Sequence, residues 1–360
     1  MVINAARIGG VGGLRSFAEA LAGCFEGMPG VVAVLPEGVP LNASIAKKRI
    51  WSTLASSGRI SLFRPIVWWI YGAFFFPARS CDRILCSTHH VLPLHRRQVV
   101  TVHDIRPYYY PDSWVQSLNF RFLLPRALKR CDGILTVSET SKRILTSVYG
   151  LEEHRIHVVP NVVDTDFFHP APRQSASCEP YLLTVGSSWK HKNVAELLRV
   201  HSYWDSKYKL KIVAAAGQYL DFLKDLAKAS MIQDRVEFLT DIPVVKLRDL
   251  YQNCSALVYP SLMEGFGLPP LEAMSCGRPV VISDMPLFRE LYSEIPIYVR
   301  LGDNYSWREA FAVLEGISEE RTQSGVVHAR SYSRARMRSA VFHALESIWG
   351  KDFSKEVFES

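Results

Sequence analysis

The 360-residue sequence lacks several features that would place it in a specialised class. Its seven cysteines form no CxxC pair and lie scattered, which argues against a zinc site and a disulfide framework and indicates a reducing compartment. The apolar run at residues 65–78 is too short to span a bilayer, which takes about 20 residues. No signal peptide precedes the first strand-like segment, and no repeat of 20–50 residues is present. We therefore expect a globular protein of the cytoplasm.

The composition is that of a folded protein, with 48% hydrophobic and 21% charged residues. Short strand-like runs alternate with helical patterns along the whole chain, which predicts βαβ units and mostly parallel sheets. The strand-like runs are 31–35, 99–102, 134–137, 156–159, 182–185, 210–214, 236–239, 257–260 and 280–283. The helical patterns are 14–25, 118–130, 139–148, 194–204, 220–229 and 245–252.

The best domain boundary is the proline- and serine-rich stretch 167–180, which has no periodicity. It predicts an N-terminal domain over 1–170 and a C-terminal domain over 171–335, each long enough for one doubly wound sheet. A final helix within 336–360 could pack back on the first domain. We therefore expect an α/β protein of two Rossmann-like domains facing across a cleft, where ligands meet the carboxyl ends of the strands.

The net charge of +7 indicates nucleic acid, an anionic membrane or a phosphorylated ligand as partner. Much of the excess lies in residues 47–97, where nine lysines and arginines flank the aromatic run 65–78. Basic residues around aromatics are typical of a helix at a membrane surface, although a buried core helix with a basic edge would look the same. No recognised nucleic-acid motif is present, so we expect no nucleic-acid partner.

The run from Glu264 to Glu272 is the most informative stretch. It follows a strand-like segment, 256–260, and leads into a helix expected from Pro270 to Cys276, since proline fits a first helical turn. One carboxylate is thus expected on a loop and the other in the first turn. Intervening glycines let N–H groups approach a ligand, and a helix N-terminus favours phosphate. The pattern indicates a diphosphate flanked by two rings, although a turn and the helix dipole would also explain the two glutamates.

A second candidate is the loop 186–193, which follows a strand and opens a helix. Gly186, small residues and then Lys192 form a phosphate-binding loop without the Walker A pattern. The lysines could equally be a solvated helix start.

Two weaker signals lie in the first domain. The glycines of 9–13 allow either close backbone approach or a simple tight turn. His103 ends a strand, where it could donate to a phosphate or sugar hydroxyl or be a structural histidine; Asp104 and the segment 160–164 read more readily as turn residues.

These motifs together resemble glycosyltransferase family 4, retaining enzymes of the GT-B fold. The likeness covers nearly the whole chain in order, and the segment from Glu264 to Glu272 is its most specific part. The resemblance implies a catalytic set of His103, Lys192 and Glu264. It also implies that Glu272 accepts from the ribose, that Glu264 contacts the donor sugar and that Lys192 binds the diphosphate. The further donor-binding residues that it implies are Gly12, Gly13, Gly186, Ser187, Lys190, His191, Thr240, Asp241, Gly265, Phe266, Gly267 and Leu268.

One departure concerns Ser187, where many members have an arginine as a second phosphate contact. A subgroup of mannosyl- and rhamnosyltransferases has a similar pattern, in which Lys190 or His191 could supply the charge. This favours GDP-mannose or a related GDP-sugar, with UDP-sugars open. No Asp-x-Asp motif is present where a metal would be needed, so we expect no essential metal and no cofactor beyond the donor.

The resulting hypothesis is a retaining hexosyltransferase. It would act on a saccharide or lipid-linked oligosaccharide in bacterial surface polysaccharide or lipopolysaccharide assembly. It would be peripheral on the inner face of the plasma membrane, as a monomer or weak dimer. The main alternative is an inactive sugar-nucleotide or polysaccharide-binding protein on the same fold, for which Ser187 is the only hint. An epimerase or a phosphorylase is a further alternative.

Overall fold

The chain forms two compact units, each built on a parallel sheet. The computed structural model describes residues 1–6, 12–50, 64–78, 82–172, 179–351 and 353. One unit comprises residues 1–162 and 333–360, and the other comprises 163–332. The first three glycine-loop positions, 9–11, and the parts 51–63 and 79–81 of the basic stretch lie outside the described residues.

The N-terminal unit contains, in its described part, a seven-stranded parallel sheet of order β3-β2-β1-β4-β5-β6-β7. The chain starts near the centre of the sheet at β1 and builds outwards on both sides, as in a doubly wound fold. Its strands are β1 (Val2–Asn4), β2 (Val32–Pro36), β3 (Ala46–Ile50), β4 (Ile84–Cys86), β5 (Gln98–Thr101), β6 (Gly133–Thr136) and β7 (Ile156–Val158). Its helices are α1 (Gly13–Gly23), α2 (Arg64–Phe74), α3 (Arg106–Tyr109), α4 (Trp114–Leu118), α5 (Leu124–Leu128), α6 (Glu139–Tyr149) and α14 (Arg334–Trp349).

The C-terminal unit repeats this plan with a six-stranded parallel sheet of order β10-β9-β8-β11-β12-β13 in its described part. Its strands are β8 (Tyr181–Val185), β9 (Lys209–Val213), β10 (Val236–Leu239), β11 (Ala256–Tyr259), β12 (Val280–Ser283) and β13 (Ile297–Val299). Its helices are α7 (Val194–Arg199), α8 (Gln218–Ala229), α9 (Val244–Asn253), α10 (Leu268–Ser275), α11 (Pro286–Tyr292), α12 (Asn304–Glu315) and α13 (Glu319–Arg330).

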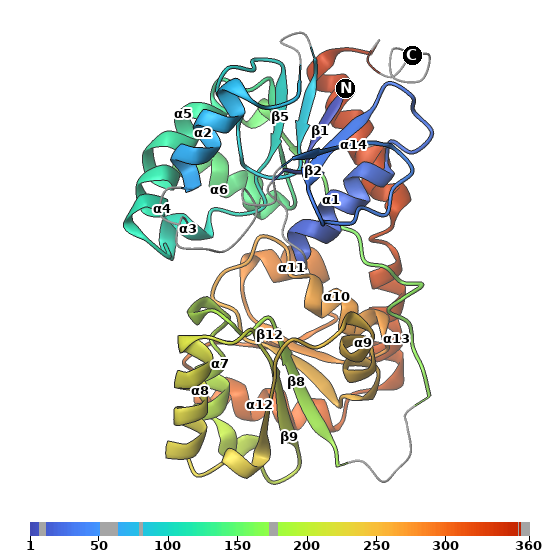
Figure 1. Ribbon diagram of the computed structural model, residues 1–360. Helices are drawn as coiled ribbons and strands as arrows, with labels where there is room; N and C mark the ends of the chain where they lie inside the picture. The colour runs from blue at the N-terminus through green and yellow to red at the C-terminus, as the bar shows by residue number, and fades with distance from the viewer. Residues whose placement is uncertain (7–11, 51–63, 79–81, 173–178, 352, 354–360) are drawn as a thin grey trace. The chain divides into compact units, whose positions relative to one another are not determined.

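Helices cover both faces of the C-terminal sheet (Figure 1). On one face, α7, α8 and α12 bury their apolar stripes against alternate residues of the central strands, with Trp204 and Trp307 fully enclosed. The other face carries α9, α10 and α13, of which α10 and α13 pack against each other. Strands buried on both faces read as continuous apolar runs, which is why the sequence predicts all the strands of this sheet except the short β13.

The chain passes between the units at Val162/Val163 and returns at Tyr332/Ser333. Both points precede the sequence-based limits of 170 and 335. The segment after Val163 belongs to the C-terminal unit because Phe168 is buried there, with its ring 5.8 Å from that of Tyr251.

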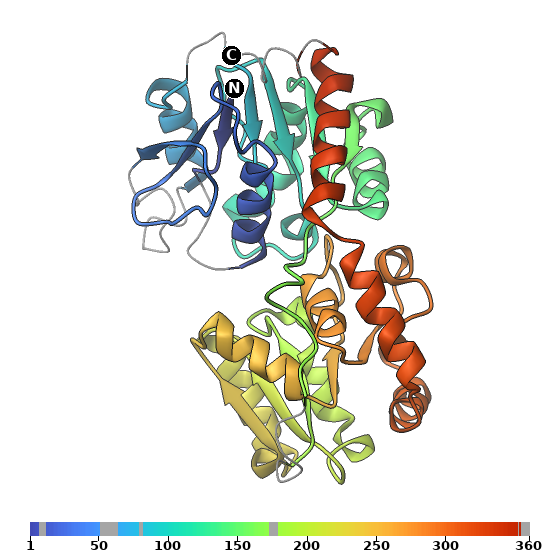
Figure 2. The same cartoon turned by 90° about the vertical axis from the view of Figure 1, so that its right-hand side faces the viewer.

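Helix α14 returns to the N-terminal unit and packs along α1, as Figure 2 shows. The rings of Phe25 and Phe342 lie 5.3 Å apart, and the Trp349 indole N–H donates to Asp132 Oδ2 at 2.7 Å.

Candidate donor-binding site

The candidate site lies where two neighbouring strands of the C-terminal sheet end. Strands β8 and β11 pair in the centre of the sheet, with Leu182 opposite Ala256 and Leu183 opposite Leu257. The sheet continues from β8 to β9 in one direction and from β11 to β12 in the other. Loops that leave such neighbouring strands diverge and open a crevice at the carboxyl edge. The sequence places its two strongest motifs on these two loops.

Lys192 and Glu264, which are 72 residues apart in sequence, form an ion pair at this edge. Lys192 Nζ lies 2.5 Å from Glu264 Oε1 and 2.6 Å from the Tyr259 hydroxyl, and both charged side chains are largely buried. Ser261 Oγ donates to the same glutamate oxygen at 2.7 Å. The hydroxyls thus hold the ion pair in place from the end of β11.

The environment of Glu264 favours its charged form. Burial opposes ionisation of the carboxyl, but the Lys192 ammonium and the hydrogen bonds from Lys192, Ser261 and Tyr259 outweigh burial and hold its pKa below the usual value. Glu264 is therefore ionised at neutral pH. An ionised, fixed carboxylate can only accept hydrogen bonds, as contact with sugar hydroxyls requires.

Glu272 has the opposite electrostatic character. Burial raises the pKa of its carboxyl to about 7, and a hydrogen bond from Tyr251, 2.8 Å from Oε2, lowers the pKa only in part. Helix α10 begins at Leu268, so Glu272 lies in its second turn and the expected helix start at Pro270 is wrong. The expected place in the first turn, where the helix dipole favours an anion, is therefore wrong too, since that effect fades within one turn.

Three backbone donors lie between the two glutamates. Within the described chain, the N–H groups of Phe266, Gly267 and Leu268 have no hydrogen-bond partner. Gly267 adopts φ +92°, and a Cβ there would lie 3.0 Å from the ring of Phe288. Leu268 is followed by Pro269 and Pro270, which have no N–H groups. The N–H groups with which α10 could bind an anion are therefore confined to residues 266–268.

The loop after β8 contains a one-turn helix, Lys190–Lys192, that positions Lys192. Gly186 adopts φ +73°, and its missing Cβ would lie 3.9 Å from Lys192 Cε. Ser187 is fully buried, and its N–H donates to the Val213 carbonyl at 3.1 Å, so it shapes the loop from inside. His191 is buried as well, whereas Lys190 is exposed.

The two positions expected near the base, Thr240 and Asp241, are exposed and follow β10 at the edge of the sheet. Asp241 has φ +50°, which fits a tight turn. Because β10 is two strands from β8, these residues lie roughly 10 Å along the edge from the loop of Lys192.

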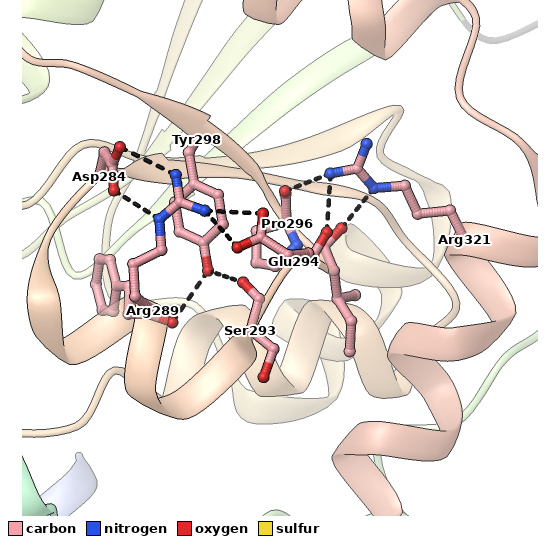
Figure 3. Close-up of polar contacts among 9 residues, drawn as sticks. Asp284, Arg289, Ser293, Glu294, Pro296, Tyr298 and Arg321 are labelled. Carbon is pink, nitrogen blue, oxygen red and sulfur yellow. Dashed lines mark hydrogen bonds and ion pairs between the residues drawn. The ribbon is translucent and has the colours of Figure 1, made fainter.

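Another acid at the same edge, Asp284, is already engaged (Figure 3). The Arg289 guanidinium donates to both oxygens of Asp284, at 2.7 and 3.0 Å, and to Glu294, and it lies 3.6 Å from the centre of the Tyr298 ring. The hydrogen bonds from Arg289 hold the pKa of Asp284 low. Asp284 therefore stabilises the segment that connects β12 to β13.

The remaining sequence-predicted residues lie in the N-terminal unit. Gly12 adopts φ +114° and precedes α1, of which Gly13 is the first residue. His103 Nε2 lies 2.9 Å from the Ser87 carbonyl, which can only accept, so Nε2 carries the proton. Burial lowers the His103 pKa, so the ring is neutral and its Nδ1 is an acceptor. We expected His103 to donate a hydrogen bond to a ligand, but its remaining ring nitrogen, Nδ1, can only accept one.

Sequence reasoning missed the aromatic hydroxyls of the site. Tyr251 and Tyr259 are fully buried and appear in the sequence as ordinary apolar helix and strand residues. Only the proximity of Tyr259 to the motif at Glu264 could have indicated a role.

The family models and relatives that match this sequence show that the protein is a glycosyltransferase. Residues 84–167 match the family model described as Glycosyltransferase Family 4, and residues 167–294 match Glycosyl transferases group 1. A relative from Salmonella typhimurium, O-antigen chain mannosyltransferase RfbU, is 38% identical over 272 residues, covering 74% of this chain and 75% of the relative. The chain therefore belongs to glycosyltransferase family 4.

Other known proteins agree with this assignment. The O-antigen chain mannosyltransferase B of Escherichia coli is 29% identical over 67% of this chain and 70% of its own. Among solved structures, Anabaena Alr3699/HepE, in complex with UDP and glucose, covers 96% of this chain and 99% of its own with a TM-score of 0.76 at 15% identity. The likeness establishes the GT-B fold of this glycosyltransferase.

Proposed function

We propose that this enzyme transfers mannose, or a related hexose, from a GDP-sugar to a hydroxyl of a lipid-linked saccharide in bacterial surface polysaccharide assembly. The observation that carries the proposal is the buried ion pair of Lys192 with Glu264, at the sheet edge where family 4 enzymes are expected to bind the donor. Two relatives support the choice of sugar and of pathway: they are named O-antigen chain mannosyltransferase RfbU and O-antigen chain mannosyltransferase B.

The proposed chemistry is a substitution with retention at the anomeric carbon. The acceptor oxygen bonds to that carbon on the face from which the phosphate oxygen departs, and the hydroxyl proton passes to the departing phosphate. The nucleoside diphosphate leaves with the bonding electrons. Lys192 and the N–H groups of Phe266 to Leu268 would stabilise the negative charge that grows on it.

The other residues would position the donor. Glu264, ionised and fixed, would accept from hydroxyls of the hexose, and Glu272 would accept from the ribose. His103 Nδ1 would accept from a hydroxyl of the hexose. Because Lys192 supplies the positive charge, we propose that no metal ion is required. Full transfer activity in excess EDTA tests this point, and activity restored only by a divalent cation would contradict it.

The donor proposal is tested by ligand-induced stabilisation. GDP, UDP and ADP and their hexose derivatives are titrated while the unfolding temperature is measured, since a ligand of the folded state raises it by mass action. We expect the largest shift with GDP-mannose, and Lys192→Met should reduce that shift. A larger shift with UDP-sugars would overturn the choice of base, and no shift with any of them would overturn the proposed function.

A membrane-bound acceptor is supported by the exposed face of the N-terminal unit. Helix α2 exposes Val67, Ile70 and Phe74 at helical spacing, and Phe74 is 76% exposed. The neighbouring segment from α4 to α5 exposes a second apolar row, and Figure 1 shows both on the same side of the unit. That second row is Trp114, Leu118 and Phe122, flanked by the exposed Arg121 and Arg126.

Apolar side chains beside arginines are the composition of an interfacial surface that binds anionic lipid. None of the described helices is both long and apolar enough to cross a bilayer. We therefore propose peripheral attachment to the inner face of the plasma membrane, by the N-terminal unit of a monomer or weak dimer.

Flotation with vesicles tests this attachment. Recovery should be higher with phosphatidylglycerol-containing vesicles than with phosphatidylcholine alone, and Phe74→Ser should lower it. Phe222→Ser removes an exposed phenylalanine from α8 in the other unit and serves as the matched control. Equal recovery with both vesicle types, or none with either, would contradict the attachment.

A further inference from the structure

A half-open hollow lies in the N-terminal unit between α2 and the helical segment from residue 119 to 127. Its volume is about 50 Å³, and about 440 Å³ when the space open to solvent is counted, so it can enclose only part of a small molecule. Residues of three segments line it: the middle of α2, the loop after β4, and the segment across α5. The lining includes Trp68, Trp69, His89, His90, Asn119 and Leu123.

The hollow adjoins the edge of the sheet where His103 lies. His89 and His90 follow β4, and His103 follows β5, the strand paired with β4. The 2.9 Å hydrogen bond between His103 Nε2 and the Ser87 carbonyl joins the two loops directly. A molecule in the hollow could therefore extend one of its groups towards His103 without leaving this unit.

The walls of the hollow are held in place by contacts of their own. His90 Nδ1 lies 2.9 Å from Thr88 Oγ1, and its ring stacks on that of His89 at 4.3 Å. The indole N–H of Trp68 donates to the Val91 carbonyl at 3.0 Å, so this buried ring forms a fixed floor. A preformed site costs little ordering on binding.

The chemistry of the lining suits a sugar ring. Trp69, 41% exposed, offers an aromatic face for the C–H side of a pyranose. The Asn119 carboxamide both donates and accepts, which matches hydroxyl groups. Few polar groups among aromatic walls are typical of small-molecule sites. Among the described residues, no lysine, arginine, aspartate or glutamate lines the hollow, which disfavours a phosphate as its occupant.

We propose that this hollow seats one edge of the non-reducing sugar of the acceptor and directs its hydroxyl towards His103. The inference rests on the proposed function and specifies where its acceptor binds. It also fits the apolar row of α2, since Trp69 lies between Val67 and Ile70 of that row. The sugar of a lipid-linked acceptor would then sit beside the surface that meets the lipid.

Kinetics with short-chain acceptors test the proposal. The probes are phenoxyundecyl-diphosphate-linked N-acetylglucosamine, galactose, rhamnose and mannose, with GDP-mannose as donor in detergent solution. For the probe that is glycosylated best, Asn119→Ala and Trp69→Leu should each raise the acceptor KM about five- to tenfold, the range that one lost sugar contact gives. The donor KM, the Kd for GDP and the hydrolysis of GDP-mannose without acceptor should stay within twofold.

Two matched variants control for folding and for surface effects. Ser117→Ala trims a polar residue two positions from Asn119, and Tyr305→Leu removes an aromatic ring that is 59% exposed on α12 of the other unit; neither residue lines the hollow. Both should leave the acceptor KM unchanged.

An unchanged acceptor KM in Asn119→Ala and Trp69→Leu would overturn the proposal, as would equal effects in the control variants. If GDP-mannose binds and is hydrolysed but no probe is glycosylated, binding of each probe is measured by the change in tryptophan fluorescence. No change with any probe at millimolar concentration would overturn the proposal. A change that Trp69→Leu abolishes would support it. Failure to bind any nucleotide would instead refute the proposed function.

Discussion

Glu272 makes a sharp test because its roles in stability and binding oppose each other. In the unfolded chain its carboxyl has an ordinary pKa near 4.5, and in the folded protein burial raises the pKa to about 7. Between these values the native state holds a proton that the unfolded state has released, so stability falls as pH rises through this window. At about 1.4 kcal/mol per pH unit the full cost at pH 8 is about 3 kcal/mol, and about 2 kcal/mol after allowing for partial exposure.

Glu272→Gln removes that cost and keeps the shape. The amide oxygen can still accept the hydrogen bond from Tyr251, which now lies 2.8 Å from the carboxylate. We therefore expect the variant to be more stable than the natural protein at pH 8 by about 2 kcal/mol, or roughly 5 °C in unfolding temperature. At pH 5, only just above the unfolded pKa, the gain should shrink to about 0.5 kcal/mol. Both differences can be measured by urea and thermal unfolding.

Nucleotide binding should change in the opposite direction. A ribose hydroxyl donates to an ionised carboxylate more strongly than to a neutral group, so the natural enzyme should bind through the charged form of Glu272. With a pKa of about 7, the Kd for GDP-mannose should rise about tenfold between pH 8 and pH 6. GDP-mannose is the right ligand because its diphosphate diester has no titration in this range. Glu272→Gln should bind weakly and without this dependence.

The control is Glu264, whose pKa is lowered and which stays ionised across the same range. Tyr251→Phe removes the hydrogen bond that lowers the Glu272 pKa, so it should move the binding midpoint to higher pH. A Kd that is flat from pH 6 to 8 in the natural enzyme, or a Glu272→Gln variant less stable at pH 8, would refute this account of the site.

Three further substitutions test other parts of the structure. Lys192→Met leaves Glu264 buried without its cation, so the free energy of unfolding should fall by about 3 kcal/mol at pH 7. At pH 5 the carboxyl can take a proton, so the loss should be smaller. Equal losses in urea unfolding at both pH values would contradict this. Gly267→Ala strains a backbone at φ +92° and brings a Cβ within 3.0 Å of Phe288, so the unfolding free energy should fall by about 1–3 kcal/mol, and an unchanged value would mean that this loop is not fixed. Arg289→Met should cost only about 1 kcal/mol, because its ion pairs are partly exposed, and the cost should shrink in 1 M salt.

The longer buried strands were predicted correctly, whereas the three-residue buried strands β4 and β13 were missed. Strands such as β8 and β12 are enclosed on both faces and appear as short apolar runs. Strand β3 was missed because it is an edge strand: Lys47, Lys48 and Arg49 are exposed there, so the segment looked only like part of a basic cluster. The run 118–130 was predicted as one helix, but it divides at a π-helical turn before Pro125, which cannot donate a helical hydrogen bond.

The site was predictable residue by residue but not as an arrangement. The motifs located Lys192 and Glu264 separately, and only the pairing of β8 with β11 reveals that they form one ion pair. The opposite pKa shifts of Glu264 and Glu272 depend on what surrounds each carboxyl, and the surrounding groups come from residues 192, 251, 259 and 261. The spacing of eight residues between Glu264 and Glu272 does not predict which groups surround each of them.

The same contrast explains why two glutamates so close in sequence would serve different ends of one donor. Glu264 is charged before any ligand arrives, because Lys192 already compensates it, so a diphosphate that drew Lys192 away would leave the carboxylate free to accept from the hexose. Glu272 has no such cation and is nearly half protonated at pH 7, so hydroxyls that donate to it would complete its ionisation. Binding at Glu264 therefore requires the phosphates of the nucleotide sugar, and binding at Glu272 requires its ribose. A ligand with only one of these parts, such as guanosine or inorganic diphosphate, should bind far more weakly than GDP-mannose, and equal affinities would show that the two carboxylates do not act on one molecule.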